Sequence, residues 1–280
     1  MTFTKRYSHG LYLLAGYTYA HAIDTATSNL ADVPQNSLNY AAERGNADFD
    51  IRNRFTLAAT YDLPSVKSKL QLLQGWQLTT IVTLEGGEPF SLFDSFNDES
   101  STGEFEDRWN ITGPASNIHW SPTNSIPFID PSTFILDGSG NVIGGNQQCI
   151  NAAGPKNQAA LNQLGNYGCF TSGSTVLTPP AQGTFGDTGR NAFRGPSFKN
   201  VDFSISKLFK LTDRLSLQFR GEFFNIFNHP NFDVFSMNTD LSSPESVGLV
   251  TFTPDLGSAS NPVLGSGGSR HIQFGAKFSW

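Results

Sequence analysis

The 280-residue sequence predicts an all-β fold, specifically a segment of an antiparallel transmembrane β-barrel. First, several stretches of about ten to twelve residues alternate apolar and polar side chains, so a strand formed there has one apolar and one polar face. Second, the connections between them alternate between short and long. A bilayer-crossing barrel strand needs about 9–11 residues, against about 5–6 in most globular strands, and such barrels have short turns on one side only. A soluble β-sandwich shows the same alternation of side chains. It predicts neither strands of this length nor connections that alternate between short and long.

Composition also favours a membrane barrel. Charged residues make up 15% of the chain and aromatic residues 12%, including 24 Phe, which suits rings exposed to something other than water. The net charge of −6 leaves no basic surface for nucleic acid, so we expect no nucleic-acid partner. The apolar runs are far shorter than the roughly 20 residues of a membrane-spanning helix. The chain does not open with a signal peptide, so for an exported protein we expect coding sequence upstream of Met1.

The alternation predicts about six to seven strands. The first is the tail of a strand, followed by a tight turn, and six full strands follow. Their expected ranges are 3–6, 11–21, 53–63, 76–85, 199–209, 215–223 and 270–280. Polar, Gly- and Pro-containing stretches predict long loops at 23–50, about 86–196 and 225–269.

The last strand shows the alternation most clearly. Every second residue is apolar and the residues between carry no large apolar side chain, and the chain ends on an aromatic residue. The apolar set is Ile272, Phe274, Ala276, Phe278 and Trp280.

In a barrel, the apolar face of each strand contacts lipid and the polar face lines the lumen. Aromatic residues near the strand ends would then form the girdles at the membrane interfaces; they are Tyr17, Tyr19, Tyr61, Trp76, Phe209 and Trp280. Counting residues around the short turns places opposite charges across from one another on the lumen face. We expect Arg54 to pair with Glu85, and Asp202 with Arg220, as braces of the wall.

The connection from about 86 to 196 has no sustained period, and connections this long are usually functional. A short helix is expected at 157–164. Cys149 and Cys169 are predicted to form a disulfide worth about 3 kcal/mol in an oxidising compartment, the alternative being two free thiols. An acidic patch predicts a solvated loop, with a cation site as the alternative; it comprises Asp94, Asp98, Glu99, Glu104, Glu106 and Asp107.

Six full strands and a partial one are too few to close, because bacterial single-chain barrels begin at eight strands. An open sheet edge in lipid leaves backbone groups unpaired at several kcal/mol each. We therefore expect the sheet to be completed by upstream strands or by further copies of the chain.

The sequence predicts no enzyme. It has no nucleophile elbow, phosphate-binding loop or paired metal-ligand spacing, so no catalytic, cofactor-binding or metal residues are proposed and no cofactor is expected. Nothing in the loops identifies a ligand or the residues that would bind it.

Several motifs from one end of the chain to the other resemble the C-terminal part of Oar-like TonB-dependent outer-membrane receptors. The most specific is the block from Phe223 to Phe232 together with the aromatic terminus. The motifs are YTYAHAID (17–24), AERGNADFD (42–50) with Arg52 and RF (54–55), GWQL (75–78), GTFGDTGRN (183–191), RGPSFKN (194–200), FRGEFFNIFNHPNF (219–232) and SRHIQFG (269–275).

The resemblance implies that residues 1–280 are the C-terminal part of a 22-stranded barrel in the bacterial outer membrane, with a long extracellular loop at about 86–196. Such a receptor holds an N-terminal plug, on which the TonB energy-transducing complex pulls to admit a bound ligand. No plug or TonB box matches this sequence, so contact with that complex is expected only through a plug outside it. The alternative function is a surface binding or adhesion protein without transport.

The resemblance also implies partners for the chain other than a ligand. Outer-membrane lipid would surround the strands. The barrel-assembly machinery would recognise the terminal strand, in which Ile272, Phe274, Ala276, Phe278 and Trp280 occupy the alternating positions of the assembly signal.

Overall fold

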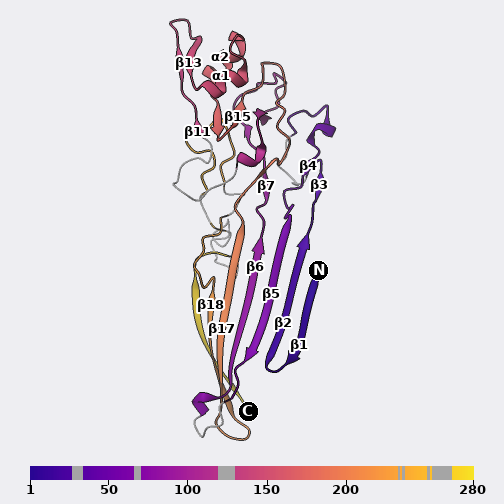
Figure 1. Ribbon diagram of the computed structural model, residues 1–280, viewed down its shortest axis with the longest axis vertical. Coiled ribbons are helices and arrows are strands. Elements are labelled where there is room, and N and C mark those ends of the chain that lie inside the picture. Colours follow the sequence, from indigo (N-terminus) through magenta and orange to yellow (C-terminus); the bar gives the residue numbers. More distant parts are fainter. Residues whose placement is uncertain are drawn as a thin grey trace.

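In the computed structural model, residues 1–26, 34–65, 71–118, 130–232, 234, 237–250, 253 and 267–280 are described. A seven-stranded antiparallel sheet dominates the fold, with strand order β1-β2-β5-β6-β17-β18-β19 (Figure 1). Its strands are β1 (Thr2–Ser8), β2 (Leu11–Tyr19), β5 (Asn53–Asp62), β6 (Trp76–Glu85), β17 (Phe198–Lys210), β18 (Ser216–Phe224) and β19 (His271–Ser279). Each neighbour in the sheet is also the next long strand along the chain, so the sheet is an up-and-down meander. The all-β class and the positions of the seven strands are confirmed.

The register keeps the apolar rows of neighbouring strands on one face. Tyr61 pairs with Leu78, and Leu78 pairs with Ile205 on its other side. Phe219 pairs with Ala276 in the closing strand. Because side chains directly opposite in a sheet share a face, these rows form one apolar wall across all seven strands.

This apolar wall is not covered by protein within the described part of the chain. Two clusters of buried apolar residues exist there, and neither contains a residue of the seven-stranded sheet. Phe274 remains 82% exposed and Trp280 94% exposed. A soluble sandwich would bury such a face against a second sheet, so the described residues support lipid contact instead.

Lys207 is a charged residue in the apolar row, and its position near the turn end of β17 explains how it is tolerated. Its Nζ donates to the carbonyl oxygens of Gln71 at 2.6 Å, Leu208 at 2.9 Å and Gln74. The ammonium also lies 4.5 Å from the ring centroid of Phe209. The Lys207 ammonium therefore reaches the polar turn, while the aliphatic part of the side chain lies along the apolar face.

The two ends of the sheet differ. At one end lie short connections and the C-terminus, and the 3-10 helix at Gln71–Leu73 occupies one of these turns (Figure 1). At the other end the chain makes long excursions, as the sequence predicts. No helix among the described residues is long and apolar enough to span a membrane.

The longest excursion folds into a separate body above the sheet, which we call the loop unit (described residues 86–118 and 130–196; Figure 1). The predicted helix is present as α2 (Gln158–Tyr167), and α1 (Gln147–Ala153) lies beside it. The small strands of the unit are β7 (Pro89–Phe90), β8 (Phe93–Asp94), β9 (Asp107–Arg108), β10 (Asn110–Thr112), β11 (Asp130–Pro131), β12 (Phe134–Leu136), β13 (Val142–Gly145), β14 (Phe170–Ser172), β15 (Thr175–Thr178) and β16 (Phe193–Arg194). Another pair, β3 (Ile23–Asp24) and β4 (Gly45–Asn46), belongs to the first excursion.

The loop unit has its own hydrophobic core. Trp109 and Phe170 are each 1% exposed, and their ring centroids lie 5.6 Å apart. Val247, from the excursion that precedes β19, is fully buried in the same cluster. Two long connections therefore pack together above the sheet, which gives the predicted loop a compact structure that its irregular sequence did not reveal.

Candidate functional site

The polar wall of the sheet contains one of the two predicted charge braces. Arg54 and Glu85 are register partners on β5 and β6, and Arg54 Nε lies 2.9 Å from Glu85 Oε1. The Arg54 side chain is 56% exposed. A salt bridge this exposed contributes about 0–1 kcal/mol to the free energy of unfolding. Its main effect is to hold these two side chains in place on the polar wall.

The predicted pair of Asp202 with Arg220 is wrong. The hairpin register pairs Lys210 with Ser216 and Ser206 with Arg220, which leaves Asp202 four positions away from Arg220 along the strand. The centre of the turn between β17 and β18 lies closer to the C-terminus than counting residues around the turn had assumed, and this shifts the register of the pair. Arg220 instead pairs with Glu222 on its own strand at 3.2 Å.

Asp202 has a different role at the loop end of the sheet. One of its carboxylate oxygens accepts hydrogen bonds from the Asn225 N–H at 2.9 Å and from Asn200 Nδ2 at 2.9 Å. The Asp202 carboxylate therefore fixes the position at which the chain leaves the sheet after β18.

A hollow of about 270 Å³ lies between β6, β17 and β18. Its lining includes Gln77, Thr79, Ser204, Arg220 and Glu222. Hydroxyl, amide and charged groups can exchange hydrogen bonds with a polar solute or with water. Ile81, Phe203, Phe223 and Phe224 also line the hollow, and its lining brings no nucleophile and base together, so it offers mixed polar and apolar contacts and no catalytic arrangement.

A buried ion pair joins the first excursion to the loop unit. Arg108 donates to both carboxylate oxygens of Glu43, at 2.6 and 2.9 Å, and its Nε donates to the Thr188 carbonyl at 2.9 Å. The two side chains are only 5% and 2% exposed. This is a bidentate, charge-assisted contact with every oxygen of the carboxylate engaged.

Two further arginines, Arg190 and Arg194, form ion pairs that extend these contacts towards the sheet. Arg190 binds the Asp24 carboxylate and donates from Nε to the Glu43 carbonyl at 2.9 Å, and Arg194 binds Asp50. Burial alone would raise the pKa of Asp50, but hydrogen bonds from Arg194, the Ala22 N–H and Arg52 outweigh it and hold the pKa below its usual range. We call the contacts made by Glu43, Asp50, Arg108, Arg190 and Arg194 the joint.

Sequence reasoning missed the joint, although four of its five residues lie in the motifs at 42–50, 183–191 and 194–200; Arg108 lies outside them. The partners are 65 residues apart for Glu43 and Arg108, and 144 apart for Asp50 and Arg194. The only available signal was the concentration of Asp, Glu and Arg in those irregular motifs.

The most specific motif, at 219–232, ties the last excursion to the sheet. Asn225 Nδ2 donates to the Gly268 carbonyl at 2.6 Å, and Asn231 Nδ2 donates to the Gly267 carbonyl at 2.8 Å. Asn231 Oδ1 also accepts the Lys199 N–H at 2.7 Å. Two buried amides thereby hold the beginning of β19 against the beginning of β17.

We predict that Asn231→Ala destabilises the entry to β19. The substitution leaves the Lys199 N–H and the Gly267 carbonyl without their partner, and a buried unsatisfied group costs about 1–3 kcal/mol. Hydrogen exchange at residues 267–271 in detergent micelles should rise by at least about tenfold, which corresponds to 1.4 kcal/mol.

Asn228→Gly is the matched control for this prediction. It removes a hydrogen bond of 2.9 Å to the exposed Arg270 N–H and suits the positive φ of 51° at this position. The comparison leaves out Arg270, whose own N–H the control releases; equal exchange at residues 267–269 and 271 in the two variants would contradict the assigned role of Asn231.

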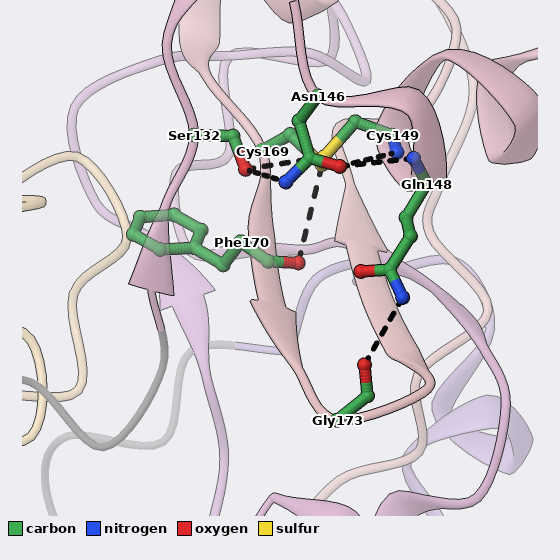
Figure 2. Close-up of a disulfide and its surroundings, with 7 residues drawn as sticks. All are labelled: Ser132, Asn146, Gln148, Cys149, Cys169, Phe170 and Gly173. Carbon is green, nitrogen blue, oxygen red and sulfur yellow. Dashed lines mark hydrogen bonds between the residues drawn. A yellow bond between two sulfur atoms is a disulfide. The ribbon is translucent and has the colours of Figure 1, made fainter.

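The two cysteines form a disulfide inside the loop unit (Figure 2). It links α1 to the residue that precedes β14, and both cysteines are buried. Asn146 caps α1 by accepting the Gln148 N–H at 2.9 Å, and its amide donates to Ser132 Oγ at 3.0 Å. The bridge therefore fastens the helical part of the unit to its small sheet.

The acidic patch is not the solvated loop that its composition predicts. Asp94, Glu99 and Asp107 are each 0% exposed, whereas Asp98 lies nearer the surface and accepts hydrogen bonds from the Thr102 and Gly103 N–H groups. The β8–β9 pairing places Asp94 directly opposite Asp107. This short pairing folds the acidic segment back on itself and turns three carboxylates inward.

The predicted assembly-signal residues all lie in β19 or directly after it, on the apolar wall. Ile272, Phe274, Phe278 and Trp280 are between 51% and 94% exposed. At the turn end of the sheet, Trp76 and Phe209 flank Lys207, where the predicted aromatic girdle places them. Recognition of the signal by assembly machinery stays a prediction.

The sheet has long antiparallel strands, an uncovered apolar wall, a polar wall and long connections at one end only. The family model described as "Outer membrane beta barrel domain" matches residues 1–273, nearly the whole chain. No curated protein and no solved structure gives a significant match. The chain therefore belongs to the outer membrane beta barrel domain family, and its strands lie in the outer membrane of a bacterium.

Proposed function

We propose that this chain is the C-terminal part of the barrel of an Oar-like TonB-dependent outer-membrane transporter. The observation that carries the proposal is the sheet itself. Seven strands form one open meander, and the outer edges of β1 and β19 pair with no other strand among the described residues. Since unpaired backbone groups in lipid cost several kcal/mol each, further strands must complete a larger barrel.

The structural roles of the family-like motifs support the same proposal. The motifs at 42–50, 183–191 and 194–200 supply the Glu43 and Asp50 carboxylates and the Arg190 and Arg194 guanidinium groups of the joint, and the motif at 219–232 supplies the buried amides beside β19. In a transporter, such contacts would hold the extracellular excursions above the opening of the barrel. The polar wall below would line the passage.

Transport would need the parts that the resemblance implies beyond this chain. A plug would fill the lumen, and the TonB complex would act on the ligand only through that plug. The chain itself would contribute lipid-facing strands, a polar wall and the loop unit, with no catalytic step.

The growth of single and double deletion strains of the bacterium that makes this protein tests the proposal. Strains lacking this protein, TonB or both would be grown with limiting iron complexes, cobalamin or polysaccharide. We expect loss of this protein to impair growth on one nutrient class, with no further loss in the double mutant.

The alternative is a surface binding or adhesion protein, and the disulfide-bonded loop unit is the observation that favours it. In that case loss of the protein would reduce attachment to surfaces or cells. Attachment that is lost without any nutrient defect, and that is unchanged by loss of TonB, would contradict transport.

We also propose that the barrel-assembly machinery recognises β19. Deletion of Trp280 from the complete protein should lower its amount in the outer membrane severalfold, while each assembled molecule keeps its heat-modifiable folded form. Lys277→Gln on the opposite face of β19 is the control and should assemble normally. Unchanged membrane levels after deletion of Trp280 would contradict the assignment.

A further inference from the structure

Three carboxylates are enclosed in the loop unit where β8 and β9 pair. Asp94, Glu99 and Asp107 are each 0% exposed. Glu99 is held in place by its main chain, because its carbonyl accepts the Gly183 N–H at 2.7 Å. Burying several acids together is costly unless each charge is compensated.

The hydrogen bonds compensate only part of this charge. Asp94 accepts the Phe96 N–H at 3.0 Å and the Asn97 N–H at 2.8 Å on one oxygen, and Asn97 Nδ2 at 2.9 Å on the other. Asp107 Oδ2 accepts the Ser100 N–H at 2.7 Å. Asp107 Oδ1 and both carboxylate oxygens of Glu99 are buried and accept no hydrogen bond from an N–H or hydroxyl group.

No cationic side chain neutralises the group within the described part of the chain. None of the ion pairs found there includes Asp94, Glu99 or Asp107. Tyr167, the last residue of helix α2, is the group that this helix places near the cluster. Burial, and then the charges of Glu99 and Asp94, raise the pKa of the Tyr167 hydroxyl. Asp98, on the same segment as the cluster, adds a further negative charge.

The carboxyl of Glu99 lies within hydrogen-bonding reach of the Asp94 carboxyl. Burial first, and then the charge of Asp94, raises the pKa of Glu99 to about 8, and burial also raises the pKa of Asp107. Two carboxylates in contact need a proton or a cation between them. One proton on Glu99 would serve only this contact and would still leave Asp107 Oδ1 buried without a partner.

We propose that Glu99 and Asp107, beside Asp94, bind a divalent metal cation, and that the cation is Ca²⁺. The available donors are all oxygens, which hard cations prefer, and no thiol or imidazole is needed. Ca²⁺ accepts six to eight oxygens in irregular geometry, whereas Mg²⁺ demands a nearly regular octahedron.

The side chains would supply only part of the coordination. Among the described residues, no three or more His, Cys, Asp and Glu side chains lie close enough together to hold a metal ion by themselves. The three free carboxylate oxygens of Glu99 and Asp107 would therefore be supplemented by main-chain carbonyls and water. Partial protein coordination is typical of weak extracellular sites, with Kd values of about 10⁻⁴–10⁻³ M.

The cation would stabilise the acidic segment from Phe93 to Arg108, which connects directly to the joint through Arg108.

Calcium titration of the complete protein in detergent tests the site at pH 7.5. Binding of ⁴⁵Ca²⁺ by equilibrium dialysis should reach about one ion per chain. Proteolytic cleavage between residues 94 and 107 should slow at least about tenfold as free Ca²⁺ rises to about 10 mM, with a weaker effect of Mg²⁺.

Glu99→Gln and Asp107→Asn should abolish both effects. Glu104→Gln is the matched control, because this acid of the same segment instead accepts the Ser37 N–H at 2.9 Å. It should bind Ca²⁺ as the wild type does. Because wild-type binding is measured directly, a folding defect in one variant does not decide the result.

Two outcomes would overturn the proposal. One is absence of ⁴⁵Ca²⁺ binding by the wild-type protein at about 10 mM free Ca²⁺ and pH 7.5. The other is proteolytic cleavage between residues 94 and 107 that is unaffected by Ca²⁺.

Discussion

Glu43→Gln is expected to lower the free energy of unfolding of the loop unit by about 3–5 kcal/mol. The substitution leaves the Arg108 guanidinium buried, at 5% exposure, without its bidentate partner. Breaking such a pair costs more than the pair contributes, because the remaining charge has lost its solvent and its counter-ion. Chemical denaturation in detergent micelles, followed by the fluorescence of the buried Trp109, measures the change.

Glu85→Gln is the matched control, since it breaks a salt bridge of similar length in a solvated position. Arg54 is 56% exposed and loses little when its partner is neutral. The expected change is within about 1 kcal/mol. Equal effects of the two substitutions would show that the Glu43–Arg108 contact does not hold the loop unit in place.

Removing the disulfide should also have a large effect. Replacing Cys149 and Cys169 together with Ser should cost about 3 kcal/mol for a 20-residue separation, because the unfolded unit gains conformational freedom. The loss should be confined to the loop unit, since no strand of the seven-stranded sheet contains a cysteine.

Reduction provides the internal control for the disulfide. Dithiothreitol should lower the stability of the wild-type loop unit to that of the double variant, and it should leave the variant unchanged. Greater reductant sensitivity of the seven-stranded sheet than of the loop unit would contradict this assignment.

The long strands were predictable because alternation with a period of two is a local property of the sequence. Each row, such as the one from Phe55 to Tyr61, carries its own evidence for a strand and for the direction of its faces. The pair Arg54 and Glu85 followed from the same counting. The count failed for Asp202 and Arg220 because a small displacement of the turn moves every pair in the hairpin.

The loop unit and the joint were not predictable in this way. Glu43 and Arg108 meet only after two excursions fold against each other, and no local pattern encodes that contact. The acidic patch was misjudged for a related reason. A Ser- and Gly-containing run of acids has the composition of a solvated loop, and only the pairing of β8 with β9 turns Asp94, Glu99 and Asp107 inward.

The central claim is that the apolar wall of the seven-stranded sheet contacts lipid and the opposite wall faces water. Nitroxide labels on single cysteines at Phe219, Arg220, Gln273 and Phe274 test it directly in a bilayer. The native cysteines are bonded to each other and do not compete for the label. Electron paramagnetic resonance then compares the accessibility of each label to oxygen and to a polar nickel reagent.

Labels at Phe219 and Phe274 should be accessible to oxygen and protected from the nickel reagent, as expected for the bilayer interior. Labels at Arg220 and Gln273 should show the reverse preference. Loss of this alternation, or access of the polar reagent to Phe219 and Phe274, would contradict the placement of the apolar wall in lipid.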